Sequence, residues 1–194
     1  MKYRALFATL AAGLMLWAAP AAAQDEDMAA MMEAWQAAGQ PGMHHEHLAV
    51  LVGSWEAETK MWMDPSGEPT VTPAEMSYEM VMDGRYLVET IRSEVMGQPF
   101  TGQGLYAFNN VTGKIQARWI DTMSSGIYSY EGSINEAGDE IVLMGKYMDP
   151  ITKECTKTRS VMRFSADQLH YVSYETADGD ERKTMEITAT RKSM

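Results

Sequence analysis

The feature that most constrains the fold of this chain is the alternation of hydrophobic and polar side chains that begins at Trp55 and continues almost to the C-terminus. Alternation with a period of two is typical of a β-strand that buries one face. Short turns rich in glycine, asparagine, aspartate and proline divide it into ten segments, with no helical segment between them. We therefore expect ten strands joined as antiparallel hairpins. The expected strands span residues 54–63, 72–82, 85–96, 100–109, 114–121, 126–134, 140–147, 152–164, 168–176 and 182–192.

An antiparallel meander of this kind removes its exposed edges by closing on itself. We therefore predict an all-β fold, a ten-stranded antiparallel up-and-down barrel. A β-sandwich is the alternative, although it would usually need at least one long crossover connection. In the barrel, the alternation places Trp55, Thr59 and Met61 inside and Glu56 and Glu58 outside.

The segment before the alternation is predicted to be helical. Residues 24–42 form an N-terminal helical segment, which acidic residues can cap at its start and which a glycine- and proline-rich stretch ends. A second short helix, at about 43–52, leads into the first strand through Gly53 and Trp55. The predicted lipocalin-sized barrel domain thus comprises residues 43–194.

The first 23 residues have the pattern of a secretory signal peptide. They begin with the basic residues Lys2 and Arg4, continue as an apolar run over residues 5–19 and end in Ala21-Ala22-Ala23. The alternative is a membrane anchor, for which the apolar run is short. We therefore predict cleavage after Ala23 and a soluble mature protein without a membrane anchor, periplasmic or secreted.

Charge and cysteine content exclude some partners and linkages. The net charge is −11 at pH 7, and loss of the two basic residues of the signal peptide would make the mature chain more acidic. Nucleic acids and anionic membranes repel such a protein, so we expect neither as a partner. Cys155 is the only cysteine, so no intramolecular disulfide can form. Its alternation with Lys157 and Arg159 predicts an outward position.

Several motifs, in order along the chain, resemble those of the lipocalin-like (calycin) barrels. The first is His47-x-x-x-Leu51-x-Gly53-x-Trp55. The later motifs are Asp83-Gly84-Arg85-Tyr86-Leu87, Gly97-Gln98-Pro99-Phe100-Thr101-Gly102-Gln103-Gly104, Trp119-Ile120-Asp121-Thr122-Met123-Ser124 and Met185-Glu186-Ile187-Thr188-Ala189-Thr190-Arg191-Lys192. Together they resemble a family of secreted bacterial lipocalin-like proteins catalogued as a domain of unknown function, and more distantly the nitrobindin-type ten-stranded barrels. The resemblance implies that Arg191 packs on Trp55 and closes the base of the barrel.

A barrel of ten strands is wide enough to hold a cavity, with a solidly packed core as the alternative. The strand pattern predicts an apolar lining with a few polar groups, as small-ligand sites require. The candidate ligand-binding residues are Tyr78, Glu89, Ile91, Trp119, Asp121, Met162 and Tyr171. Glu89 and Asp121 would be costly to bury unless Tyr78, Trp119, Arg92 or a ligand hydrogen-bonds to them. We predict a small, largely apolar molecule as the ligand, and no cofactor.

Other functions stay open as alternatives. His44, His45 and His47 follow methionines and could bind copper or zinc, but their spacing matches no standard site. Haem could bind through His170, as the resemblance to nitrobindin-type barrels implies, but the alternation turns this residue outward. The barrel could also be a structural module without a ligand. No nucleophile–base motif is present in the sequence, so we expect binding without catalysis.

Overall fold

The computed structural model describes residues 21–64, 66–177 and 179–193. The chain divides into two compact units, Met1–Gln36 and Ala37–Met194. The first unit holds most of helix α1 (Ala21–Gly39), whose start lies before the predicted cleavage point after Ala23. Most of the predicted signal peptide, residues 1–20, lies outside the described residues. Among the described helices, none is both long enough and apolar enough to cross a membrane.

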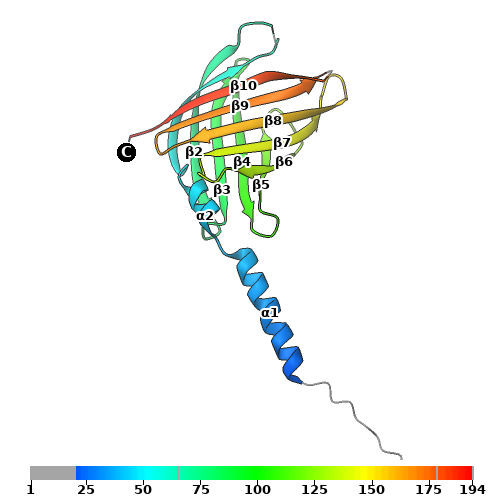
Figure 1. Ribbon diagram of the computed structural model, residues 1–194. Coiled ribbons are helices and arrows are strands. Elements are labelled where there is room, and N and C mark those ends of the chain that lie inside the picture. The colour runs from blue at the N-terminus through cyan, green and yellow to red at the C-terminus, as the bar shows by residue number, and fades with distance from the viewer. Residues whose placement is uncertain (1–20, 65, 178, 194) are drawn as a thin grey trace, which may run out of the picture. The chain divides into compact units, whose positions relative to one another are not determined.

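The second unit is a closed antiparallel barrel (Figure 1). Each strand pairs with its neighbours in sequence, and β1 pairs with β10 to complete the ring. This closure confirms the predicted ten-stranded up-and-down barrel and excludes the sandwich. The strands are β1 (Gly53–Met61), β2 (Thr70–Val81), β3 (Tyr86–Val95), β4 (Gln98–Asn109), β5 (Lys114–Asp121), β6 (Tyr128–Ile134), β7 (Glu140–Met148), β8 (Cys155–Phe164), β9 (Gln168–Ala177) and β10 (Asp180–Arg191).

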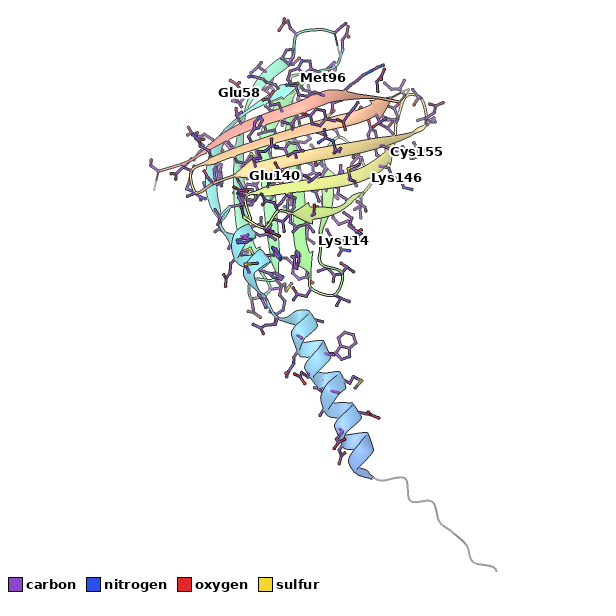
Figure 2. All side chains as sticks on the ribbon, viewed as in Figure 1. Glu58, Met96, Lys114, Glu140, Lys146 and Cys155 are labelled. Atoms are coloured by element: carbon purple, nitrogen blue, oxygen red, sulfur yellow. The ribbon has the colours of Figure 1, made fainter. Side chains whose placement is uncertain are left out.

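Side-chain alternation sorts the residues of each strand between the interior and the surface. On β1, Trp55 and Thr59 are buried whereas Glu56 and Glu58 are exposed, as the sequence pattern predicts. Figure 2 shows exposed charged side chains such as Glu58, Lys114 and Lys146 around the barrel. The pattern ends with the strands, because residues in the turns no longer follow the pleat.

Met82 and Cys155 lie at the ends of strands, where the alternation stops or begins. Met82 has the same parity as the inward Met76 and Tyr78 of β2, but it lies in the β2–β3 turn with φ 52° and is exposed. The pleat has ended there, so its side chain no longer shares the face of Met76 and Tyr78. Cys155 begins β8 and is exposed, as its alternation with basic residues predicts (Figure 2).

Helix α2 (Met43–Ala49) packs against one end of the barrel, which we call the base. Its N-terminus is capped by His45, whose Nδ1 accepts a hydrogen bond of 3.0 Å from the Gly42 N–H. Leu48 and Leu51 are fully buried and fill the interior under the helix. The helix is shorter than the expected 43–52 because single turn-type hydrogen bonds, such as Val52 N–H to Ala49 O at 3.1 Å, replace the helical ones after Ala49.

Trp55 and Arg191 close the base together. Trp55 is fully buried and its Nε1 donates to the Leu51 carbonyl at 2.9 Å. The Arg191 guanidinium lies 4.3 Å from the centre of the indole ring and donates to the carbonyls of Val50, Val52 and Ala166. Gly53 has φ 132°, and a Cβ there would come within 2.6 Å of Arg191 Nη1. The expected contact is therefore present, and it also joins β10 to the turns on either side.

Removal of the indole should destabilise the whole barrel. We expect Trp55→Ala to lower the free energy of unfolding by about 3–5 kcal/mol, as truncation of a buried tryptophan does. Arg191→Lys should also destabilise, because one ammonium group cannot replace a planar guanidinium that stacks and donates to several carbonyls. Urea unfolding measures both changes.

Trp62→Ala is the matched control, because Trp62 is only half-buried and packs on Lys183. Trp62→Ala should lower the free energy of unfolding clearly less than Trp55→Ala does. An unfolding midpoint that Trp55→Ala leaves unchanged would show that the indole does not hold the base closed.

Candidate functional site

The barrel encloses a cavity of about 490 Å³. Its wall is largely apolar, and inward side chains from all ten strands contribute to it. Small residues on the inner face, among them Ala117, Ser160 and Ser173, leave this space unfilled. The cavity decides between the two expectations for the interior, since a solidly packed core would leave no such volume.

All seven predicted ligand-binding residues line this cavity. They are Tyr78, Glu89, Ile91, Trp119, Asp121, Met162 and Tyr171. Tyr78, Glu89, Ile91 and Met162 are buried, whereas Trp119, Asp121 and Tyr171 are half-buried. Strand parity brings them to one space, although they come from five different strands. Their role in binding a ligand stays a prediction.

A buried carboxyl group, Glu89, lies in the wall with 5% of its surface exposed. Its Oε1 accepts a hydrogen bond of 3.0 Å from the Tyr78 hydroxyl, and its Oε2 accepts one of 2.7 Å from the Tyr106 hydroxyl. Burial raises the pKa of Glu89, although the two tyrosine hydrogen bonds oppose this change. Burial and the neighbouring Glu89 also raise the pKa of both tyrosines, so their hydroxyls stay protonated.

The hydrogen bonds of Glu89 and Asp121 agree in part with the expected partners. Two of the partners expected for these carboxyl groups are present, since Tyr78 donates to Glu89 and Trp119 donates to Asp121, whereas Arg92 is on the outer face. The missed partner is Tyr106 on β4. Its position was available from the sequence, because Tyr106 shares the parity of the inward-facing Gly102. The alternation indicates its face, but it does not indicate which inward side chains meet across the barrel.

The end of the barrel away from α2 carries a row of polar and aromatic side chains. Trp119 Nε1 donates to Asp121 Oδ2 at 2.8 Å, and the Met123 N–H donates to Asp121 Oδ1 at 2.8 Å. The Trp119 ring lies where a Cβ at Gly102 would be, so only glycine fits at that position of β4. Asp121 thus orients the indole at the edge of the cavity.

The same row continues on the next strands with residues that sequence reasoning missed. Tyr128 pairs with Trp119 across β5 and β6, and its ring meets that of Tyr147 edge-on with centroids 6.0 Å apart. The Tyr147 hydroxyl donates to Glu175 Oε1 at 2.9 Å. Burial, and then Glu175, raise the pKa of Tyr147, so this hydroxyl remains a donor. We call Trp119, Asp121, Tyr128, Tyr147 and Glu175 the rim.

Two threonine hydroxyls in the cavity wall have no hydrogen-bond partner in the part of the chain that the structure describes. They belong to Thr59 on β1 and Thr158 on β8, which are 7% and 8% exposed. An unpaired buried hydroxyl costs about 1–3 kcal/mol. Both residues line the cavity, so their hydroxyls can bond to a molecule that enters it.

The three histidines considered as copper or zinc ligands lie at the base of the barrel, where they cap α2 or pack against their neighbours. His45 caps α2, the His44 ring packs 4.2 Å from the Phe108 ring, and the His47 ring packs on the Gly138 backbone. Burial lowers the pKa of His44 and of His45, as expected for imidazoles in such packing. Over residues 21–64, 66–177 and 179–193, no three side chains of His, Cys, Asp or Glu are grouped as a metal site.

His170, the residue considered for haem, lies on the outer face of β9. Its Nε2 is 2.8 Å from Glu186 Oε1. Hydrogen bonds from Lys183 and then from His170 lower the pKa of Glu186 to about 2. His170 borders an open surface depression of about 830 Å³ together with Glu58 and Arg163. Its position outside the wall gives no route for its ring to reach the cavity.

The pKa shift of Glu89 predicts a pH dependence of stability. The folded protein holds this proton to a higher pH than the unfolded chain, so stability falls as the pH rises from about 4.5 through the raised pKa. Glu89→Gln is neutral throughout and keeps groups that can bond to both tyrosines. We expect its unfolding free energy to increase relative to wild type as the pH rises, measured by urea unfolding from pH 4 to pH 8.

Glu131→Gln is the control, because its stability relative to wild type should change with pH in the opposite direction. A hydrogen bond from Lys114 lowers the pKa of the exposed Glu131, so the variant should lose stability relative to wild type as the pH rises toward 4.5, in unfolding curves extended below pH 4, and the difference should stay constant at higher pH. If the difference in unfolding free energy between Glu89→Gln and wild type does not change with pH, Glu89 is not a buried carboxyl group that holds its proton.

The unpaired hydroxyl of Thr158 predicts a gain in stability on its removal. Thr158→Val replaces the hydroxyl with a methyl group of similar shape in an apolar wall, so we expect the free energy of unfolding to rise by about 1 kcal/mol. Thr188→Val, an outward exposed position on β10, is the control and should change little. Thermal and urea unfolding measure both. A loss of stability in Thr158→Val would mean that the hydroxyl already has a partner in the free protein.

Comparison with known proteins places the chain by its fold and its family. No curated protein matches the chain. A crystal structure titled Rv2717c from M. tuberculosis matches with a TM-score of 0.60 and 20% identity, over 79% of this chain and 100% of that chain. An S-type phycobiliprotein lyase, CPES from Guillardia theta, matches with a TM-score of 0.54 and 11% identity, over 77% and 92%.

Both identities are low, so these likenesses show a shared barrel fold and nothing further. The similarity to nitrobindin-type barrels stays a prediction. A family model covers residues 40–191, which is the barrel together with α2. The chain therefore belongs to the family DUF1579, described as "Protein of unknown function".

Proposed function

We propose that this protein binds a small, largely apolar molecule in the barrel cavity. The observation that carries the proposal is a largely apolar cavity of about 490 Å³ whose wall holds buried hydroxyls that have no partner among the described residues. An apolar space with a few convergent polar groups is the usual form of a small-ligand site. The unpaired hydroxyls of Thr59 and Thr158 cost stability, and a ligand that bonds to them would recover it.

The lining suits a ligand with an apolar body. Met76, Ile91 and Met162 contribute flexible or branched hydrocarbon surface, and methionine side chains adapt to irregular shapes. Glu89 has both oxygens bonded to tyrosines, so it holds the wall together more than it offers a free group to a ligand. This arrangement supports binding without chemical change, because the strongest polar group in the wall is already satisfied.

The proposed location is the periplasm or the exterior of the cell, with the first 23 residues removed. Support comes from the basic start, apolar run and Ala-x-Ala ending of the N-terminal sequence. A binding protein in such a compartment would meet apolar molecules that water dissolves poorly, and an enclosed cavity would shield them from water.

Uptake of a neutral fluorescent probe tests the proposed function. N-phenyl-1-naphthylamine should bind to the wild-type protein with increased emission, since an apolar cavity removes the probe from water. Ser173→Phe places a ring in the cavity from β9 and should weaken binding at least tenfold.

Ser129→Phe is the matched control, because Ser129 is exposed on β6 and faces outward. Circular dichroism and an unfolding curve confirm that both variants fold. Equal binding by the two variants would place the probe on the outer surface, and absence of binding by the wild type would favour the structural module without a ligand.

A further inference from the structure

The ionisable groups of the cavity lining are mostly acidic. Its charged lining residues are Glu89, Asp121, Glu175 and Arg118. Arg118 is exposed, follows the outward parity of β5 and donates to the Ala117 carbonyl at 2.9 Å. The cationic group therefore belongs to the outside of the wall, whereas the three carboxyl groups belong to the inside.

The two rim carboxylates have no ion pair among the described residues. Asp121 accepts hydrogen bonds from Trp119 Nε1 and the Met123 N–H, and Glu175 accepts one from the Tyr147 hydroxyl. Neutral donors orient these carboxylates but leave their negative charge uncompensated. Arg182 lies opposite Glu175 in the β9–β10 register, but it is exposed, and no described contact joins the two side chains.

Aromatic rings stand next to these carboxylates. Trp119, Tyr128 and Tyr147 follow one another across β5, β6 and β7, and the Tyr128 and Tyr147 rings are in edge-on contact. Aromatic faces attract cations, and the attraction grows where water is partly excluded, as at half-buried positions. Rings and carboxylates together form the usual surroundings of a bound ammonium group.

An unpartnered hydroxyl lies beside one of these carboxylates. Thr158 lies directly opposite Glu175 in the β8–β9 register, lines the cavity and is 8% exposed. Its hydroxyl has no partner among the described residues. A buried hydroxyl beside an uncompensated carboxylate is a pair of hydrogen-bond groups that a donor on a ligand would satisfy.

We infer that the cavity selects a cationic amphiphile, with its apolar body in the barrel and an ammonium group at the rim, beside Glu175 and Asp121. The inference rests on the proposed function and adds the ligand's charge to it. An anionic ligand is disfavoured, because the Asp121 and Glu175 carboxylates line the cavity, whereas Arg118, a basic residue of the described lining, faces outward.

Three probes that share one apolar body and differ only in their end group distinguish the contribution of charge from that of apolar binding. Each has a naphthalene ring and a short alkyl linker, which ends in trimethylammonium, hydroxyl or carboxylate. We expect the wild-type protein to bind the ammonium probe at least tenfold more tightly than the hydroxyl probe, and the carboxylate probe least tightly. Added salt should weaken only the ammonium probe, because screening acts on its charge contacts.

The double variant Asp121→Asn with Glu175→Gln should lose this preference and still bind the hydroxyl probe. Glu131→Gln is the control, because it removes one exposed carboxylate from the outer face of β6 and should leave the preference intact. Binding of all three probes with equal affinity, or a preference that survives in the double variant, would overturn the inference and leave the proposed function standing. Binding of none of the three, together with no uptake of the neutral naphthylamine, would overturn both.

Discussion

The pairing of β1 with β10 is the constraint on which the rest of the structure depends. Nine hairpins alone would leave two open strand edges, whose N–H and C=O groups would need other partners. Trp55 and Arg191 are opposite each other in this pairing, at the base of the barrel. The indole fills the interior beside the junction, and the guanidinium ties the last strand to neighbouring carbonyls. The ring is thereby closed and its base is sealed at one place.

Closure also determines that the interior is hollow. A ring of ten strands is wider than inward side chains of ordinary size can fill, especially where those side chains are alanine or serine. A polar side chain that faces this hollow interior must find a hydrogen-bond partner among the other lining residues or in a ligand. Glu89 is satisfied by two tyrosines, whereas the hydroxyls of Thr59 and Thr158 have no partner among the described residues. The unsatisfied groups, more than the satisfied ones, indicate where a ligand would bond.

The two ends of the barrel have different chemistry. At the base, His45 caps α2, and Trp55 and Arg191 donate hydrogen bonds to nearby carbonyls. At the rim, Asp121 and Glu175 are held by neutral donors beside aromatic rings. Many carboxylates of the outer surface form ion pairs, such as that of Glu131 with Lys114, whereas Asp121 and Glu175 at the rim form none among the described residues. This difference is the basis for inferring both the place and the charge of the ligand.

The sequence by itself determined the ten strands and the direction of most of their side chains, because these follow from period-two alternation and from local turn chemistry, whereas the closed end was implied by the resemblance to lipocalin-like barrels. It also placed all seven candidate residues in the cavity wall, since parity alone decides which face a residue occupies. Only the tertiary structure decided that Tyr106 meets Glu89, that Tyr147 meets Glu175, and that Thr158 has no described partner. These contacts join strands through the register and curvature of the closed sheet. A pattern along one strand carries no information about the distance to a side chain on another strand, and for that reason only the folded ring could show the rim.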